Sequence, residues 1–353
     1  MTAPAVRIDT LAVTAASSPC AGWDDYVRGH ANGTFFHLYG WGEAACAAYG
    51  YETIYLTTRR GGALAGVLAL TDAQMPLLGR SLISTAFSVG GGPLADDDDA
   101  LQALLDEAAR IGAERHVKTI ECRSDFDVPG WRAKTGSHAT FVAPLIADEE
   151  AALAAIPRKR RAELRKALAA ADAGEIDFRD QVSPDEFYRL YAQSLHRLGT
   201  PVFPRRFLDA LLSVFSADSE IVGVAARGEL VAALVNFRFG DTVLPYYVGA
   251  SDAARETRAF DYLYWMTMRR AAARGLMRFD FGRSKIDSGA YHYKELWGFK
   301  PQPVAYRVKL IGARDLPDVS TANPKFAAFS KLWPSLPLAA ANALGPLLAP
   351  NFP

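Results

Sequence analysis

The residue types best suited to chemistry gather in one stretch, Phe279–Pro303, which reads FDFGRSKIDSGAYHYKELWGFKPQP. Cations, phenols, an indole and a hydroxyl follow a short apolar run, and glycines stand where the backbone must turn. Such side chains fill a core poorly but can hold a polar, anionic ligand against an aromatic wall. The alternative is a strand, a loop and a capping helix whose aromatic residues close the end of a domain. The candidate ligand-binding residues here are Arg283, Ser284, Lys285, Tyr293 and Trp297.

A second charged group lies between the two halves of the chain. Six of the nine residues from Arg158 to Lys166 are basic. At about 100° per residue, Arg158, Arg161 and Arg165 share one face of a helix that we expect over 157–172. A charge run usually marks a solvated helix face, but Glu163 is the only acid among these nine residues. We therefore expect an anion-binding face, suited best to phosphate.

The elements that must position these residues repeat along the chain. Each half reads as a helix, an antiparallel hairpin, a strand, a helix and a final strand. Arg123-Ser124 aligns with Arg283-Ser284, and residues 66–68 align with 232–234, which indicates two units of roughly 160 residues. The predicted fold is α/β (α+β), with each unit a mixed sheet flanked by helices. We expect domains over 1–150 and 151–316, followed by an Ala/Leu/Pro-rich tail over 317–353.

The bulk composition narrows the class of protein. Lys+Arg and Asp+Glu are both 39 of 353 residues, so no overall charge recruits nucleic acid or a membrane, and recognition must be local. Three widely spaced cysteines argue for a reducing compartment and against a cysteine metal site. With no signal-peptide pattern and no window of ~20 apolar residues, a cytoplasmic protein is expected. The tail is interpreted as packing on the second unit, with peripheral membrane contact as the alternative.

Several motifs are interpreted as structural. The acidic run Asp96–Asp99 is placed to cap a helix, where carboxylates favour the dipole, so we do not expect it to bind metal. The glycines at 90–92 precede a proline and this acidic run, which would repel phosphate, so they predict a turn. His37 and His196 have no partner at metal-ligand spacing, and no metal site is predicted.

Four segments of the chain resemble the FemAB-like transferases, which consist of two tandem GNAT-type (acetyltransferase-like) domains. The match covers nearly the whole chain and is nearest to the branch associated with PEP-CTERM/exosortase exopolysaccharide systems. The segments are FFHLYGW from Phe35, IPRKRRAELRKA from Ile156, LHRLGTPVFPRRF from Leu195 and FDFGRSKIDSGAYHYKELWGF from Phe279.

The resemblance implies acyl or aminoacyl transfer to an amine on a phosphorylated, lipid-linked or nucleotide-linked saccharide precursor. It assigns contacts with the precursor's phosphates to Arg161 and Arg165, and activity to Lys294. An acetyl-CoA enzyme of this kind normally carries a Q/R-x-x-G-x-G/A loop after the third strand, whereas residues 254–259 read ARETRA. Arg255 and Arg258 are then the expected donor contacts. No permanently bound cofactor is expected; acyl-CoA and aminoacyl-tRNA both stay open as donor, and nucleic acid is expected only as that tRNA.

Amine acylation requires a deprotonated nucleophile, a stabilised oxyanion and a protonated leaving group. Asp280 is placed to act as the base, with an ion pair to Arg278 or Arg283 as the alternative. Tyr247 or Tyr291 could return the proton, although core-edge packing is the commoner role of such tyrosines. The sequence thus predicts an N-acyltransferase with its acceptor in the cleft between two units. A binding protein that has lost turnover is the alternative.

Overall fold

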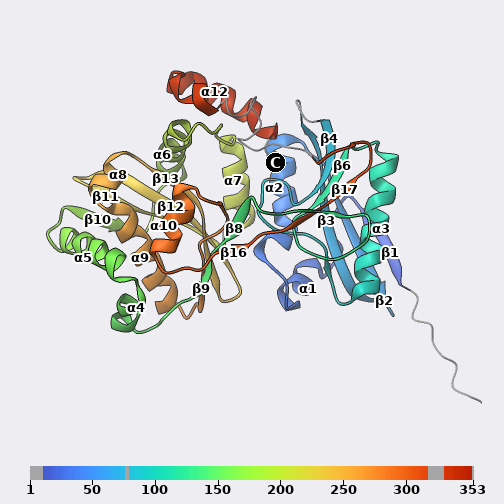
Figure 1. The fold of residues 1–353 in the computed structure, drawn as a ribbon, viewed down its shortest axis with the longest axis horizontal. Helices are drawn as coiled ribbons and strands as arrows, with labels where there is room; N and C mark the ends of the chain where they lie inside the picture. The colour runs from blue at the N-terminus through green and yellow to red at the C-terminus, as the bar shows by residue number, and fades with distance from the viewer. Residues whose placement is uncertain (1–10, 76–78, 317–329, 352–353) are drawn as a thin grey trace, which may run out of the picture. The chain divides into compact units, whose positions relative to one another are not determined.

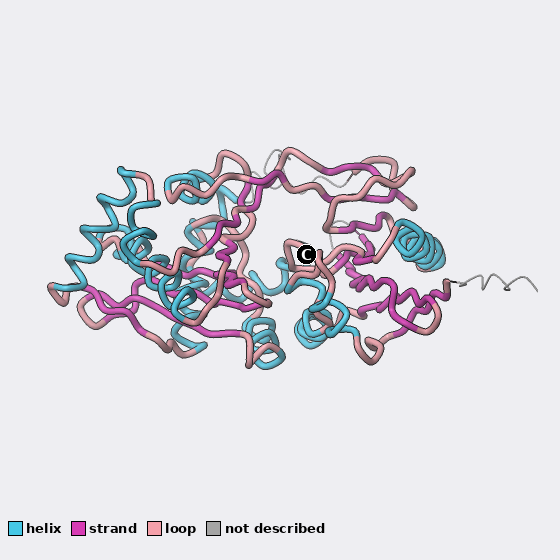
Figure 2. The backbone as a smooth tube through the Cα atoms, turned by 90° about the horizontal axis from the view of Figure 1, so that it is seen from below, coloured by secondary structure: helices cyan, strands magenta, loops and turns pink. Residues whose placement is uncertain are grey.

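The computed structural model describes residues 11–75, 79–316 and 330–351, which form two compact units. Among these residues, the first unit contains 11–134 with 305–316, and the second contains 135–304 with 330–351. Figure 2 shows helices packed with strands inside each unit. No described helix is long and apolar enough to cross a lipid bilayer.

The first unit is built on a mixed sheet with the strand order β1-β2-β3-β4-β6-β17-β7, in which β5 also pairs with β3. Only the β4–β6 pair is parallel. The strands are β1 (Ala12–Ala16), β2 (Thr53–Arg60), β3 (Ala63–Met75), β4 (Gly79–Ser84), β5 (Leu94–Ala95), β6 (Thr119–Cys122), β7 (Arg132–Lys134) and β17 (Tyr306–Leu310). The helices are α1 (Trp23–Gly29), α2 (Gly40–Tyr49) and α3 (Asp98–Glu114), with a 3-10 turn, η1, at Phe35–His37.

Helix α3 shows how the sequence dictates this local structure. The Asp97 side chain accepts a hydrogen bond from the backbone N–H of Ala100 at 2.9 Å, so the acidic run caps the helix. Leu104, Leu105 and Ala108 are buried against the sheet. The acidic run therefore caps the helix as expected, and the apolar residues form its buried face.

The second unit repeats the topology with the order β10-β11-β12-β13-β14-β9, in which only β13 and β14 are parallel (Figure 1). Its strands are β9 (Val142–Pro144), β10 (Ile176–Arg179), β11 (Ser219–Ala226), β12 (Glu229–Phe239), β13 (Thr242–Ala250) and β14 (Arg278–Asp280). A small separate sheet has the order β15-β8-β16, from β8 (His138–Thr140), β15 (Ser284–Lys285) and β16 (Gln302–Pro303).

Seven of the described helices of the second unit, α4 to α10, precede the tail. Helix α9 packs on β11 and β12, α6 packs on β12 and β13, and α5 packs on α9. The helices are α4 (Glu149–Ala155), α5 (Arg158–Asp172), α6 (Pro184–Arg197), α7 (Arg205–Val214), α8 (Ala253–Glu256), α9 (Ala259–Ala273) and α10 (Gly289–Leu296). Helix α7 was not expected from the sequence, because the turn-forming and basic residues around its start resemble a loop.

The unit boundaries differ from the predicted 1–150 and 151–316. Strand β17 pairs with β6 and β7 in the first sheet, whereas β9 pairs with β14 in the second. Each sheet is therefore completed by a strand from the half of the sequence assigned to the other unit. Strand β9 has three residues, which is too short to give a pattern, and β17 follows the second repeat directly in the chain.

The described part of the tail belongs to the second unit, whereas residues 317–329 and 352–353 lie outside the described residues. Helix α12 (Leu338–Leu348) follows a 3-10 turn at Trp333–Ser335 and contacts α6. The His196 Nε2 atom lies 2.9 Å from the carbonyl oxygen of Leu336. Residues 1–10 also lie outside the described residues, and the first described strand is β1.

Candidate active site

Strands β13 and β14 of the second unit diverge soon after they meet. Their parallel pairing comprises Thr242 with Arg278 and Val243 with Phe279, after which β14 ends at Asp280. Strand β13 continues to Ala250, paired with β12 on its other side. Within the described part of the chain, β13 from Leu244 onward therefore has no neighbouring strand on the β14 side. An extended ligand that carries amide groups can bind such a free edge.

A bulge interrupts β13 at this edge. Val235 of β12 pairs with Tyr247, but the next residue, Asn236, pairs with Pro245, so Tyr246 is the extra residue. Pro245 has no N–H and cannot complete the ladder. Bulges of this kind redirect backbone groups at functional sites, and backbone N–H groups can stabilise an oxyanion.

Lys294 is a buried cation close to the end of β14. It lies on α10, whose first turn is capped by the Ser288 hydroxyl, and its side chain is only 8% exposed. The Nζ atom donates hydrogen bonds to the carbonyl oxygens of Gly282 at 2.9 Å and Arg283 at 3.4 Å. Burial lowers the pKa of Lys294 to about 8, although the nearby Asp280 carboxylate opposes the shift. An amine with this pKa can take part in proton transfer near neutral pH.

Asp280 has the environment of a candidate base. Its Oδ1 atom accepts a hydrogen bond from the Gly282 N–H at 2.8 Å. Burial raises the pKa of the carboxyl group, and the Gly282 bond and the Lys294 charge lower it in part. The suggested ion pair with Arg278 is not formed, because Arg278 pairs with Asp241 at 2.7 Å.

The lowered pKa of Lys294 has a measurable consequence for stability. Below about pH 8 both the folded and the unfolded chain carry the ammonium, so folding bears the full cost of burying it. Between the folded-state pKa of about 8 and the usual lysine pKa of 10.5, the folded state alone is deprotonated, so stability rises with pH. The total gain is about 3 kcal/mol. Urea unfolding from pH 7 to 10.5 should show this rise in the wild type and not in Lys294→Met; parallel curves would contradict it.

A second buried cluster connects α5, α9 and α10. One guanidinium nitrogen of Arg160, Nη1, lies 2.6 and 2.8 Å from the two oxygens of Asp261, and the Tyr293 hydroxyl donates to Asp261 at 2.8 Å. The Arg160 guanidinium also lies 4.7 Å from the centre of the Tyr293 ring. Tyr293 was predicted to contact a ligand through its phenol, but that hydroxyl is engaged by Asp261. The cluster ties the basic helix to the helix that carries Lys294.

The predicted basic face of α5 points to solvent. Arg158 and Arg165 are exposed and Arg161 is half-buried. Among the described residues, none of these three side chains forms an ion pair, whereas Glu163 binds Lys166 at 2.7 Å and Arg258 at 2.9 Å. Three guanidinium groups therefore remain available to an anion on one face of the helix.

The other predicted residues occupy different environments. Tyr247 is buried beside a small apolar cavity lined by Tyr188, Tyr191, Phe203 and Phe207, and Tyr291 packs edge-on against Phe141 at 5.2 Å. Trp297 and Ser284 are buried, Lys285 and Arg255 are exposed, and Arg283 is half-buried. Arg258 has a left-handed backbone (φ 57°), a conformation that favours glycine.

The sequence analysis missed Arg160 and Asp261. Arg160 lies on the same stripe of α5 as the buried residues Leu164 and Ala167, whereas the basic face had been placed around Arg158. Asp261 is a buried carboxylate in the mostly apolar helix α9. Each residue could have been recognised as a charged residue at a helix position that the apolar spacing predicts to be buried.

The described residues contain no cluster of three groups that could hold a metal ion. His37 is buried and its Nδ1 atom accepts from the Thr34 N–H at 3.1 Å. Burial lowers the pKa of His37 to about 4, so the ring is neutral. These contacts assign His37 to local structure in the first unit.

Residues 158–295 match the family of acetyltransferase (GNAT) domains. The second unit carries a GNAT acetyltransferase domain. The chain is accordingly an acyltransferase. The matched segment includes Arg160, Asp261, Asp280 and Lys294.

Solved structures extend the likeness in fold beyond the GNAT domain. FemX aligns with a TM-score of 0.65 and 15% identity, over 82% of this chain and 95% of FemX. A tandem GNAT protein from the clavulanic acid biosynthesis pathway aligns with a TM-score of 0.54 and 12% identity, over 87% of this chain and all of that one. A conserved protein of unknown function from Bacteroides thetaiotaomicron aligns with a TM-score of 0.57 and 11% identity, over 82% of this chain and 97% of that one. No curated protein sequence matches the chain. The predicted tandem GNAT-like fold is therefore confirmed.

Proposed function

We propose that the protein transfers an acyl group to an amine on a phosphorylated or lipid-linked saccharide precursor, in exopolysaccharide or cell-envelope biosynthesis. The observation that carries this proposal is the pairing, within one GNAT domain, of a buried Lys294–Asp280 site with an exposed basic face on α5. The first suits acyl transfer to an amine, and the second suits a phosphate on the acceptor.

The donor site fits an acyl-CoA co-substrate. The free edge of β13 offers backbone groups to an extended amide-bearing chain, and the N-terminus of α9, a helix of 15 residues, follows directly after Arg255 and Arg258. Arg258 binds Glu163, which leaves Arg255 as the exposed cation of the pair. We assign the diphosphate contact to Arg255 and the α9 terminus.

The transfer itself requires one proton to leave the amine and one to reach the leaving group. The Asp280 carboxylate, directly or through water, accepts the proton of the acceptor ammonium, and its raised pKa suits this role. The amine nitrogen then forms a bond to the acyl carbon as the bond from that carbon to the leaving group breaks. We assign to Lys294 the role of opposing the negative charge that develops on the reacting centre, and to Tyr247 or Tyr291 the role of proton donor.

An aminoacyl-tRNA donor and a binding role without turnover are the competing proposals. The second has one observation in its favour: residues 253–256 form helix α8 where a CoA enzyme has a glycine-rich loop, and Arg258 is held by Glu163. The purified protein should be incubated with acetyl-CoA and a panel of nucleotide-linked amino sugars, and products identified by mass spectrometry. An N-acetylated product supports the proposal, whereas binding without product for every donor favours the alternative.

Reversing charge on the basic face of α5 should weaken acceptor binding. We expect Arg161→Glu and Arg165→Glu each to raise the KM for a phosphorylated acceptor by ~10-fold, with little change in kcat, because each removes a charge-assisted contact. The increase should shrink in high salt. Arg206→Glu, an exposed residue on α7, is the matched control. Equal KM values for all three variants would exclude the basic face as the phosphate site.

For localisation, we propose a cytoplasmic protein with peripheral membrane contact through the tail. Leu344 and Leu347 of α12 are 43% and 68% exposed, and Leu332 before it is 67% exposed. An apolar surface of this kind is consistent with access to a lipid-linked acceptor. Co-sedimentation of the full chain with anionic vesicles, compared with Leu344→Ser/Leu347→Ser, tests the contact.

A further inference from the structure

The first unit has the same strand order as the GNAT domain up to the parallel pair. It differs at the position that corresponds to the free edge of β13, which is the proposed donor site of the second unit. Leu70 of β3 pairs with Ser84 at the end of β4, and Val67 pairs with Leu94 of β5. Nine residues, 85–93, therefore lie opposite only Leu68 and Ala69. At the equivalent place in β13, the single extra residue is Tyr246.

This loop, residues 85–93, is packed into the first unit. Residues 85–88, 91 and 92 are buried. The Trp41 Nε1–H donates to the carbonyl oxygen of Ala86 at 2.8 Å, and the Phe87 ring stacks on Tyr49 at 4.5 Å. A Cβ atom on Gly91 would lie 2.3 Å from the Thr85 hydroxyl oxygen, so the packing leaves no room for even a methyl group there.

The backbone of loop 85–93 is strained, so something must hold it. Thr85 and Phe87 have positive φ values of 54° and 63°, a left-handed backbone conformation that is unfavourable for residues with a side chain. The Ser88 hydroxyl donates within the loop, to the carbonyl oxygens of Thr85 at 2.6 Å and Gly90 at 2.7 Å. Contacts from outside the loop supply the rest of the compensation.

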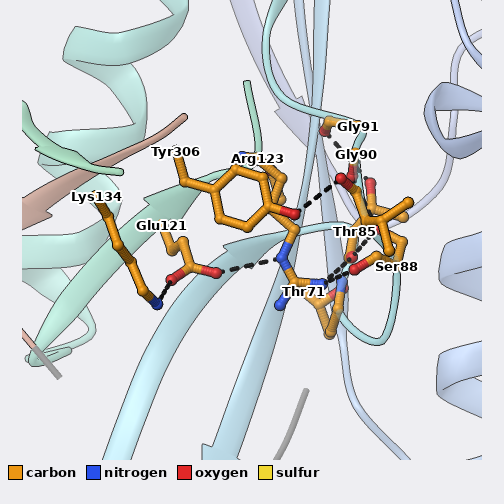
Figure 3. Close-up of polar contacts among 12 residues, drawn as sticks. Thr71, Thr85, Ser88, Gly90, Gly91, Glu121, Arg123, Lys134 and Tyr306 are labelled. Atoms are coloured by element: carbon orange, nitrogen blue, oxygen red, sulfur yellow. Dashed lines mark hydrogen bonds and ion pairs between the residues drawn. The ribbon is translucent and has the colours of Figure 1, made fainter. Parts of the chain in front are cut away.

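Arg123 provides the main contact from outside, as Figure 3 shows. It follows β6, is 6% exposed, and its Nη1 atom donates to the carbonyl oxygens of Ser88 at 2.5 Å and Thr85 at 3.2 Å. Its Nε atom lies 3.2 Å from Glu121, which also binds Lys134 at 2.9 Å. Partial burial favours the neutral Glu121 carboxyl, but these two cations outweigh it and lower the pKa of Glu121 to about 2. Tyr306 of β17 adds a hydrogen bond to the carbonyl oxygen of Val89 at 2.9 Å.

Arg123 corresponds in the repeat to Arg283 of the GNAT domain, which is predicted to contact a ligand. In the first unit the Arg123 side chain instead binds carbonyl oxygens of loop 85–93 and the Glu121 carboxylate. Loop 85–93 thus takes the place of a ligand beyond the ends of β4 and β6. Resting on the function proposed above, we infer that the chain has one acyl-donor site, in the GNAT domain, and that loop 85–93 keeps the counterpart in the first unit closed.

Calorimetric titration of the intact chain with CoA, together with hydrogen exchange read by mass spectrometry, tests this inference. We expect one CoA per chain, protection on binding in peptides over 244–260, and none over 79–95. The amides of loop 85–93 should already exchange slowly without ligand. Two CoA molecules per chain, or ligand protection over 79–95, would overturn the inference while leaving the proposed function intact.

Ligand-free exchange separates the remaining outcomes. If CoA does not bind at all, the proposed CoA donor fails, and the closed loop is judged by its own exchange rate: slow exchange supports it and rapid exchange overturns it. Arg123→Met should speed exchange in loop 85–93 by ~10-fold or more, because it removes charge-assisted bonds to two carbonyl oxygens. Arg132→Met, an exposed change on β7, should leave the loop unchanged. Equal rates in both variants would show that Arg123 does not hold the loop.

Discussion

Replacement of Lys294 by methionine is expected to lower kcat for acyl transfer by ~10²–10³-fold, the usual effect of removing one preorganised electrostatic group from an active site. Methionine keeps much of the side-chain volume between Phe141 and Phe281, whose ring centres lie 5.4 and 5.7 Å from Nζ. It cannot bind the carbonyl oxygens of Gly282 and Arg283 or offset the charge on Asp280. The loss should therefore fall on kcat rather than on KM.

Two controls make this result specific to Lys294. Lys300→Met removes an exposed lysine from the same stretch and should retain wild-type kcat. Lys294→Arg keeps a cation that does not lose its proton near neutral pH, so any activity it recovers should lack the titration near pH 8. A folded Lys294→Met protein with undiminished kcat would remove Lys294 from the mechanism.

Arg160→Met is expected to cost about 3–5 kcal/mol of folding free energy, because the buried Asp261 carboxylate then keeps only the Tyr293 hydroxyl as a side-chain hydrogen-bond donor among the described residues. Asp261 is 5% exposed, so water cannot replace the lost cation. Tyr293→Phe keeps the ring under the guanidinium and removes one hydrogen bond, so its cost should be nearer 1 kcal/mol.

Urea unfolding at pH 7, followed by circular dichroism and tryptophan fluorescence, measures both changes. Lys159→Met is the matched control, since Lys159 is the exposed neighbour on the same helix. A loss below 1 kcal/mol in Arg160→Met would show that the cluster does not stabilise the second unit. If Tyr293→Phe instead lost more folding free energy than Arg160→Met, the Tyr293 hydroxyl would be the main stabilising group of the cluster.

The repeated order of elements could be predicted from the sequence because each long strand and helix has its own periodic pattern and punctuation. Gly228 marks the β11–β12 hairpin, and Gly275 follows α9 with a left-handed backbone. Short strands carry no such signal. The three residues of β9 and the position of β17 depend on pairing between distant segments, so the unit boundaries could not be placed.

The candidate site was predictable in residue type and less so in role. Lys294 and Asp280 were selected, but the rings that pack around the Lys294 ammonium belong to Phe141 and Phe281, one of them far away in the chain. Tyr293 was assigned to a ligand because an exposed and a buried phenol look alike in a sequence. Its true partner, Asp261, lies 32 residues away on another helix.

The central claim is that the GNAT domain acylates an amine through a site that depends on Lys294. The most direct measurement is mass spectrometry of products formed from isotopically labelled acetyl-CoA and a nucleotide-linked amino sugar, with wild-type protein and Lys294→Met in parallel. The account predicts one labelled acetyl group on the amine nitrogen with the wild type and almost none with the variant. Equal product from both proteins, or none from either while the sugar still binds, would contradict it.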